Sequence, residues 1–209
     1  MPCAAGLRIY VVDNGSTDGT GRIAERAGAT AIRLPERGYG RACAAGARRA
    51  IADGATIVAF MDGDFADHPE ELPLVLGPIV EGRADLVVGS RLRGGMARGA
   101  MPWHQRLGNR VVSAMLRRLY GLPITDLGPF RAIRADALER LCMSEPTYGW
   151  TTEMLAKAGR CELRVLEVSV RYRARIGVSK ISGTVRGTIG ATYYLLTRTV
   201  RFLAWEPPV

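Results

Sequence analysis

The sequence has 209 residues, of which 47% are apolar and 23% charged, values close to those of ordinary globular domains. That length suits one domain with one core, and the composition excludes a disordered, collagen-like or low-complexity chain. The net charge of +9 is uneven: residues 1–90 carry 9 basic and 12 acidic side chains, and residues 91–209 carry 20 and 8. We therefore expect the halves to face different partners; nucleic acid, anionic lipid and a phosphorylated small molecule all suit the basic half.

The cysteine spacing and the apolar stretches argue against a zinc site, a disulfide framework, a signal peptide and a membrane span. The four cysteines are too far apart for any CxxC pair and the two histidines stand alone, so the sequence predicts neither a zinc site nor a disulfide framework. The N-terminus lacks the apolar run of a signal peptide. Residues 184–204 are the longest apolar stretch, but three arginines interrupt it, so we expect no membrane span. A location in the reducing cytoplasm is expected.

Short apolar runs alternate with helical patterns through the first ninety residues. The runs predict strands at residues 7–12, 29–34, 56–61 and 85–89. Between them, helices are predicted at residues 17–27 and 40–52, and a third begins at Pro69. Continuous apolar strands separated by helices predict a mostly parallel sheet covered on both faces, the doubly wound α/β class.

The second half is less regular and shows no repeat or linker, so we expect a single domain over residues 1–209. Helices are predicted at residues 103–120, 135–143 and 150–158, a strand at 161–172, and an amphipathic helix at 184–204. Glycine- and arginine-rich loops are predicted at residues 91–101 and 173–183. In doubly wound sheets ligands bind beyond the carboxyl ends of the strands, which is where Asp13, Asp62 and Arg91 stand.

Asp62 and Asp64 follow a buried strand and are separated by one glycine, so both carboxylates can converge on one hard cation. Oxygen ligands with open positions suit Mg²⁺ or Mn²⁺ bridging a diphosphate. The alternative is an acidic loop that caps the following helix. A calcium loop of the EF-hand type is excluded, because Ala66 stands where that loop has an oxygen ligand and Asp67 where it has glycine. An aspartyl phosphatase is disfavoured, because Ala66 also stands where that enzyme usually has a hydroxyl residue.

The context of this acidic pair resembles the family 2 glycosyltransferases of the GT-A fold. The stretches that carry the resemblance are VVDNGSTDGT at residues 11–20, FMDGD at 60–64 and VVGSR at 87–91. Two later stretches, DLGPFR at 126–131 and RIGVSK at 175–180, are similar to the branch of dolichyl-phosphate mannosyltransferase and bacterial polyprenyl-phosphate glycosyltransferases. The resemblance implies inverting transfer of a hexose from a GDP- or UDP-linked donor to a polyprenyl or dolichyl phosphate, assisted by Mg²⁺ or Mn²⁺.

In the first half the resemblance also implies individual roles. Asp13 would bind the base of the donor, Asp62 the ribose or metal region, and Asp64 the cation, so that residues 1–90 form the nucleotide- and metal-binding half. The alternative for Asp13 is a helix-capping acid. Ala66 stands where this branch often has a further polar ligand, a departure from the family pattern.

In residues 91–209, the acceptor-binding half, the roles fall on basic residues and two acids. Arg91 and Arg131 match arginines near the transferred sugar and the acceptor phosphate, and the alternative for each is a structural ion pair. The loop with Arg175, Ser179 and Lys180 would close over the donor diphosphate, or is a basic surface loop. Glu153 would orient the acceptor, act as a base or cap a helix; a hydroxyl acceptor would require Glu153 or Asp126 as the base, whereas a lipid phosphate would require none.

Two further alternatives concern the ends of the chain. The amphipathic segment 184–204 suits an anionic membrane face, which would make the protein peripheral on the inner membrane face, but it equally suits packing on the sheet. The family's fold begins with an earlier strand and helix, and this chain begins at what resembles the second strand. A non-enzymatic, shortened relative that only binds its ligands is therefore the main alternative. A nucleic-acid-binding domain is the lesser one, and no nucleic acid partner is expected, because no reading motif is present.

Overall fold

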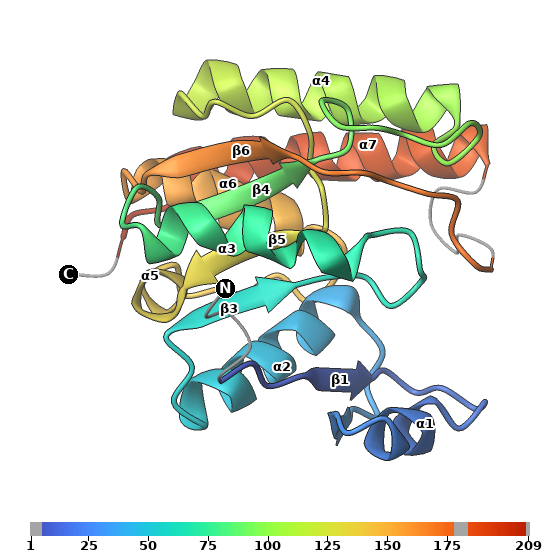
Figure 1. Ribbon diagram of the computed structural model, residues 1–209. Helices are drawn as coiled ribbons and strands as arrows, with labels where there is room; N and C mark the ends of the chain where they lie inside the picture. Colours follow the sequence, from blue (N-terminus) through green and yellow to red (C-terminus); the bar gives the residue numbers. More distant parts are fainter. Residues whose placement is uncertain (1–5, 178–183, 208–209) are drawn as a thin grey trace.

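The structure is a computed structural model and describes residues 6–177 and 184–207. Within these residues two β-sheets are flanked by helices (Figure 1). Strand β1 (Tyr10–Asp13) pairs in parallel with β2 (Thr30–Arg33) in a two-stranded sheet. The second sheet has four strands in the order β3 (Ile57–Phe60), β5 (Arg131–Arg134), β4 (Leu86–Ser90) and β6 (Val165–Ser169).

The larger sheet is mixed because β5 runs against its neighbours. β5 pairs antiparallel with both β3 and β4, whereas β4 and β6 are parallel from Leu86↔Val165 to Ser90↔Ser169. The α/β class is confirmed, but strand β5 was missed. Its sequence RAIR places arginines at both ends of a four-residue strand, so it lacks the apolar run that marks the other strands.

The helices lie close to their predicted positions, with ends that differ by a few residues. They are α1 (Thr20–Arg26), α2 (Tyr39–Ala52), α3 (Leu72–Val80) after the 3-10 turn η1 (Pro69–Glu71), α4 (Trp103–Tyr120), α5 (Ala135–Arg140), α6 (Trp150–Arg160) and α7 (Val185–Arg201) followed by η2 (Phe202–Ala204). Gly121 ends α4 in the left-handed conformation with a φ of 66°, which glycine adopts without strain. Thr184 begins α7 by accepting a hydrogen bond from the N–H of Gly187 at 3.1 Å.

Strand β4 is buried along its whole length because helices cover both faces of the larger sheet. On one face Leu86 and Val88 belong to the main core with residues of α4 and α6. On the other face Val87 packs with Val75 and Ile79 of α3. Such two-sided cover is what the uninterrupted apolar run of this strand predicts.

Helix α7 lies beside α4 and packs on α4 and α6 rather than on a strand (Figure 1). The hydroxyl of Tyr120 donates a hydrogen bond to the carbonyl of Thr199, and His104 contacts Thr188 at 2.8 Å, so the two helices run in the same direction. Of the described helices, none has the length and hydropathy needed to cross a bilayer. Of the two alternatives for this segment, packing directly on the sheet is therefore replaced by packing on α4 and α6.

Candidate functional site

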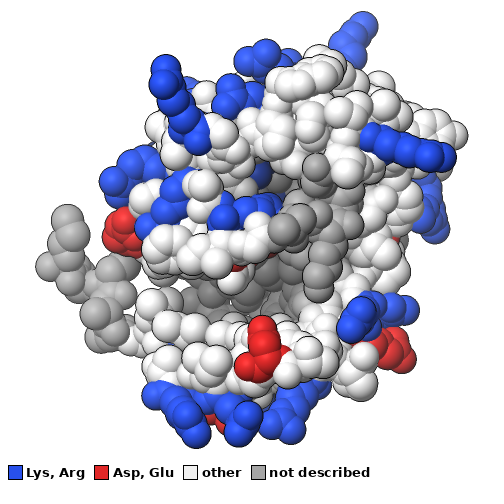
Figure 2. Space-filling view, turned by 90° about the vertical axis from the view of Figure 1, so that its right-hand side faces the viewer, with Lys and Arg blue, Asp and Glu red and all other residues white. Residues whose placement is uncertain are grey.

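The predicted site residues of both sheets lie at the edge toward which β1, β3, β4 and β6 point. Viewed from that side, the surface is hollowed across its middle, and arginine or lysine side chains stand above and below the hollow (Figure 2). The charges that act on Asp62 show which residues meet there: those of Asp64, Arg175 and Arg91 all influence its pKa. The structure therefore brings residues from three separate segments of the sequence to one edge.

The acidic pair carries a concentration of negative charge. Burial, together with the charge of Asp64, raises the pKa of Asp62 above its ordinary value. Asp64 accepts a hydrogen bond from the N–H of Ala66 at 3.0 Å, and its other oxygen lies 3.2 Å from Nη2 of Arg175. Carboxylate oxygens in this setting suit Mg²⁺ or Mn²⁺. No group of three or more His, Cys, Asp or Glu side chains in the described part of the chain could hold a metal, so a cation held by this pair needs ligands from substrate and water.

Residues 173–176 lie along the loop that carries Asp62 and Asp64 and bring Arg175 to Asp64. The N–H of Arg173 donates to the carbonyl of Ala66 at 3.0 Å, and that of Ile176 to the carbonyl of Asp64 at 2.8 Å. The guanidinium of Arg173 stacks 3.4 Å from the ring centroid of Phe65, whose positive φ of 69° is rare for a residue with a side chain. Ser179 and Lys180, the rest of the predicted diphosphate loop, lie outside the described residues.

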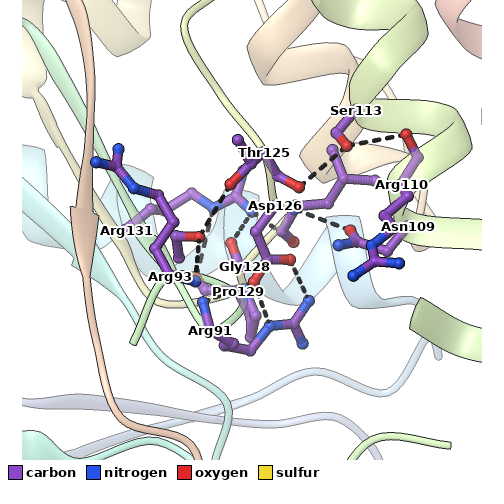
Figure 3. A network of polar contacts seen from close by, with 12 residues as sticks. Arg91, Arg93, Asn109, Arg110, Ser113, Thr125, Asp126, Gly128, Pro129 and Arg131 are labelled. Atoms are coloured by element: carbon purple, nitrogen blue, oxygen red, sulfur yellow. Dashed lines mark hydrogen bonds and ion pairs between the residues drawn. The ribbon is translucent and has the colours of Figure 1, made fainter. Parts of the chain in front are cut away.

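Arg91 and Asp126 form a buried bidentate ion pair (Figure 3). Asp126 accepts hydrogen bonds from the backbone N–H, Nε and Nη2 of Arg91 at 2.7, 2.9 and 2.7 Å. The two side chains are 12% and 0% exposed. Burial alone would raise the pKa of Asp126, but the charge and hydrogen bonds of Arg91 outweigh burial and hold it below its ordinary value. Asp126 is thus an ionised partner whose lone pairs are already engaged.

The loop that carries Asp126 is held by side chains of β6 and α4. Glu167 accepts hydrogen bonds from the N–H groups of Thr125 and Asp126 at 2.6 and 2.9 Å, and Asn109 accepts that of Leu127 at 3.0 Å. Ser113 donates to the carbonyl of Thr125 at 3.1 Å (Figure 3). Sequence reasoning missed Glu167 and Asn109. An acid inside the apolar strand VLEVS was the only signal for Glu167.

Arg131 lies behind this pair and is 1% exposed. Its guanidinium donates to the carbonyls of Leu127, Gly128 and Pro129, and among the described residues no carboxylate pairs with it. Its Nη1 has no hydrogen-bond partner there. Burial lowers the pKa of Arg131, and the negative charge of Asp62 acts against that shift. As described, Arg131 is too buried for direct contact with a substrate.

Two further polar residues of the site had no sequence signal. Burial raises the pKa of Tyr39 well above its ordinary value, to which the charges of Cys43 and Asp62 add, and Tyr39 in turn acts to lower the pKa of Asp62. Asp67 is 2% exposed, and neither oxygen of its carboxylate has a hydrogen-bond partner among the described residues. Burial and the charge of Asp62 raise the pKa of Asp67 to about 6. Both residues therefore shape the electrostatics around Asp62.

Glu153 lies on α6, is 0% exposed and has a full set of partners. Its carboxylate accepts hydrogen bonds from the N–H groups of Ser144 and Glu145 at 3.0 and 2.8 Å. Nζ of Lys157 lies 2.8 Å from Oε1 of Glu153. These contacts tie α6 to the loop at residues 143–146 rather than cap a helix end, because Ser144 and Glu145 lie outside α5 and α6.

Asp13 lies at a separate open pocket between the end of β1 and the start of α1. Its Oδ1 accepts the N–H of Ser16 at 2.8 Å, and hydrogen bonding from Ser16 lowers the pKa of Asp13. The volume of the pocket is about 350 Å³. Its lining consists of Asp13, Gly15, Ser16, Gly19, Gly21, Arg22, Arg33, Leu34 and Pro35.

Known proteins resemble this chain in sequence and in fold. Residues 4–142 match the family described as Glycosyl transferase family 2. The chain belongs to that family. This glycosyltransferase is 39% identical over 186 residues to an uncharacterised glycosyltransferase of Mycobacterium tuberculosis, an alignment that covers 88% of this chain and 83% of the relative. It is 32% identical over 209 residues to an undecaprenyl-phosphate mannosyltransferase of Micrococcus luteus, with 95% and 84% covered.

A third relative and the solved structures extend the comparison. A polyprenol monophosphomannose synthase of Mycolicibacterium smegmatis is 32% identical over 194 residues, covering 85% of this glycosyltransferase and 71% of the relative. Glucosyl-3-phosphoglycerate synthase of Mycobacterium tuberculosis, in complex with Mn²⁺, UDP-glucose and phosphoglyceric acid, superposes with a TM-score of 0.70 at 23% identity. That superposition covers 95% of this chain and 69% of the synthase, and it confirms the predicted GT-A fold.

Proposed function

We propose that this glycosyltransferase transfers a hexose, with inversion, from a nucleoside diphosphate sugar to a polyprenyl phosphate. The observation that carries the proposal is the meeting of cations and carboxylates at one hollowed edge: Arg91 and Arg175 both act electrostatically on Asp62 beside Asp64. A diphosphate with a bridging cation satisfies both signs of charge. Residues 1–90 would bind the donor and residues 91–209 the acceptor.

On the donor side, Asp13 and its pocket would hold the nucleotide base, with GDP and UDP as the alternatives. Asp62 and Asp64 would hold Mg²⁺ or Mn²⁺, which when bound supplies positive charge to the leaving diphosphate. Arg175, with Ser179 and Lys180 of the same motif, would contact that diphosphate. The Mn²⁺ and UDP-glucose in the complex of glucosyl-3-phosphoglycerate synthase support this class of donor.

On the acceptor side, hydrogen bonding favours a phosphate over a hydroxyl. A hydroxyl acceptor needs a base, but the carboxylates that the sequence offered for that role, Asp126 and Glu153, are already engaged by Arg91 and by backbone N–H groups. A phosphate is an anion near neutral pH and needs no base. The names of the two mannosyl-transferring relatives support a polyprenyl phosphate as that acceptor. Arg91 would orient it, and the charge of Arg131, which pairs with no carboxylate among the described residues, would add to the attraction.

A polyprenyl acceptor lies in a membrane, and the outer face of α4 and α7 suits contact with one. We call this face the α4–α7 face. The large apolar side chains of the two helices with more than a third of their surface exposed are Trp103, Leu107, Val111, Leu119, Val185, Ile189, Tyr193 and Val200. The two helices contain seven arginines and no Asp or Glu. Both begin at the end of the molecule toward which β4 and β6 point (Figure 1). We therefore propose peripheral contact with anionic lipid on the inner membrane face.

The donor proposal is tested by thermal shift with a panel of UDP- and GDP-sugars, with and without Mn²⁺. We expect one donor class to raise the Tm only in the presence of Mn²⁺, and Asp64→Ala to remove the dependence on Mn²⁺. Unchanged Mn²⁺-assisted binding by Asp64→Ala in calorimetry would contradict the cation assignment. A donor that binds without any transfer would favour the alternative of a non-enzymatic relative.

The membrane proposal is tested by flotation with vesicles that contain phosphatidylglycerol. We expect the double variant Leu107→Gln/Ile189→Gln to float several-fold less than the wild type. The matched control is Leu74→Gln/Val80→Gln, which removes two exposed apolar side chains from α3. Equal losses in both variants, or equal binding to vesicles of phosphatidylcholine alone, would contradict a specific α4–α7 face.

A further inference from the structure

We propose that Glu167 is a positioning residue of the transfer reaction, which fixes the backbone at residues 125–126 so that Asp126 holds Arg91 in place. This inference rests on the proposed function, because it assigns Arg91 to the substrate. Glu167 does not itself reach the hollow: its side chain is 1% exposed. It acts through one loop and one ion pair.

The loop between α4 and β5 has no regular hydrogen bonding of its own around Asp126. The N–H groups of Thr125 and Asp126 both end on Glu167, at 2.6 and 2.9 Å, and the hydroxyl of Thr125 donates to it at 2.9 Å. Buried N–H groups need partners, and hydrogen bonds to a charged acceptor are about twice as strong as neutral ones. The carboxylate of Glu167 therefore replaces the secondary structure that this loop lacks.

The register of the sheet explains why Glu167 reaches the loop. Glu167 lies opposite Val88 on the neighbouring strand β4, two residues before Ser90, after which Arg91 leaves the sheet. Strand β4 thus leads into Arg91, and the neighbouring strand β6 carries Glu167, which binds the loop of Asp126, the partner of Arg91. Nη1 of Arg93 lies 3.4 Å from Oε2 of Glu167, and the Arg93 side chain is 55% exposed. Pairing with Arg93 therefore contributes little to holding Glu167 in place.

Loss of Glu167 should loosen Asp126 and let Arg91 leave its bidentate geometry. A displacement of a substrate-positioning group by about 1 Å can lower a rate by about 100-fold. We therefore expect Glu167→Ala to reduce turnover toward polyprenyl phosphate by roughly 10- to 100-fold while the KM for the donor changes far less. Glu167→Gln keeps one acceptor oxygen and should recover part of that loss.

The deciding measurement is a double-mutant cycle between Glu167→Ala and Arg91→Lys, because coupling separates a positioning role from general destabilisation. If Glu167 acts through Arg91, Glu167→Ala costs little further turnover once Arg91 is Lys. Asp85→Asn is the control, since Asp85 joins β4 to Arg164 at the opposite end of the same strands. Multiplicative losses in the cycle, or a lower Tm with unchanged turnover, would overturn the proposal.

Hydrogen exchange of the amides at residues 125 and 126 gives a readout that needs no activity. We expect these amides to exchange faster in Glu167→Ala and to be unchanged in Asp85→Asn. Unchanged exchange in Glu167→Ala would overturn the positioning role, whatever the substrate. Absence of transfer by the wild type, with faster exchange in the variant, would instead mean that the proposed function is wrong and the loop geometry right.

Discussion

The two ends of the β4–β6 strand pair carry ion pairs of matching geometry. At the amino end, Asp85 accepts the backbone N–H, Nε and Nη2 of Arg164 at 2.9, 3.0 and 2.7 Å. At the carboxyl end, Asp126 accepts the same three groups of Arg91 at 2.7, 2.9 and 2.7 Å. What differs is burial: Arg164 and Asp85 are 53% and 15% exposed, whereas Arg91 and Asp126 are 12% and 0% exposed.

This contrast shows what geometry alone does not reveal about an ion pair. An exposed pair is screened by water and joins two strands at little cost, whereas a buried pair must be compensated by further hydrogen bonds. The loop of Asp126 receives further hydrogen bonds from Glu167. The more exposed pair of Asp85 does not require such support. If the proposed function holds, Arg91 is positioned by this support to meet an anionic substrate without reorganisation.

The largest effect is expected at the carboxyl end. Asp126→Asn leaves the buried charge of Arg91 without its partner, so we expect a loss of about 3–5 kcal/mol in the free energy of unfolding and at least a 100-fold lower turnover. Denaturant unfolding and initial rates measure the two quantities. Arg91→Lys, which keeps the charge but not the fork, should lower turnover with a smaller loss of stability. If Asp126→Asn were as active as Asp85→Asn, the proposed difference between the two ends of the strand pair would be wrong.

A smaller effect on stability, but still a large one on turnover, is expected at Arg175. The side chains of Arg175 and Asp64 are 36% and 21% exposed, yet their pair lies at the carboxyl edge. A variant of Arg175 therefore tests whether the effect on turnover depends on the location of an ion pair rather than on its burial. Arg175→Ala should leave the Tm almost unchanged and lower turnover by roughly 10- to 100-fold, because the cation meets charge that develops on the leaving group. An effect confined to the KM for the donor would show a passive binding surface.

The smallest effect is expected at the amino end. Asp85→Asn should lower the Tm by about 2 °C or less and leave turnover unchanged, since exposed pairs contribute little. The hydrogen bonds of Arg164 lower the pKa of Asp85, so its contribution is present at neutral pH and is lost as the pH falls through that lowered pKa, below 3.8. Thermal melts from pH 7 to pH 2 should therefore converge for variant and wild type. A difference that grows toward low pH would contradict the assignment.

Much of the fold could be predicted because the relevant signals are local. The apolar run at residues 85–89 predicts a strand and the alanine-rich stretch at 40–52 predicts a helix, each from its own residues alone. The family motifs likewise led to Asp62, Asp64 and Arg91, which the structure brings to one edge.

The rest depends on contacts between distant segments. The position of β5 between β3 and β4 depends on pairing with both, and its four residues carry no periodic pattern. Glu167 could not be assigned because its partners, Thr125 and Asp126, are 41 or more residues away in the sequence. The hydrogen bonds of Asp126 and Glu153, which argue against either residue as a general base, could not be predicted from the sequence for the same reason.

The most direct test is transfer itself. Wild type, Asp126→Asn and Asp85→Asn would each be incubated with radiolabelled UDP- and GDP-hexoses, Mn²⁺ and undecaprenyl phosphate, and the label that enters the organic phase would be counted. The predicted result is Mn²⁺-dependent label from at least one donor, equal in wild type and Asp85→Asn and about 100-fold lower in Asp126→Asn. No organic-phase label from any donor, or equal losses in the two variants, would contradict the assignment of sugar transfer to the carboxyl edge.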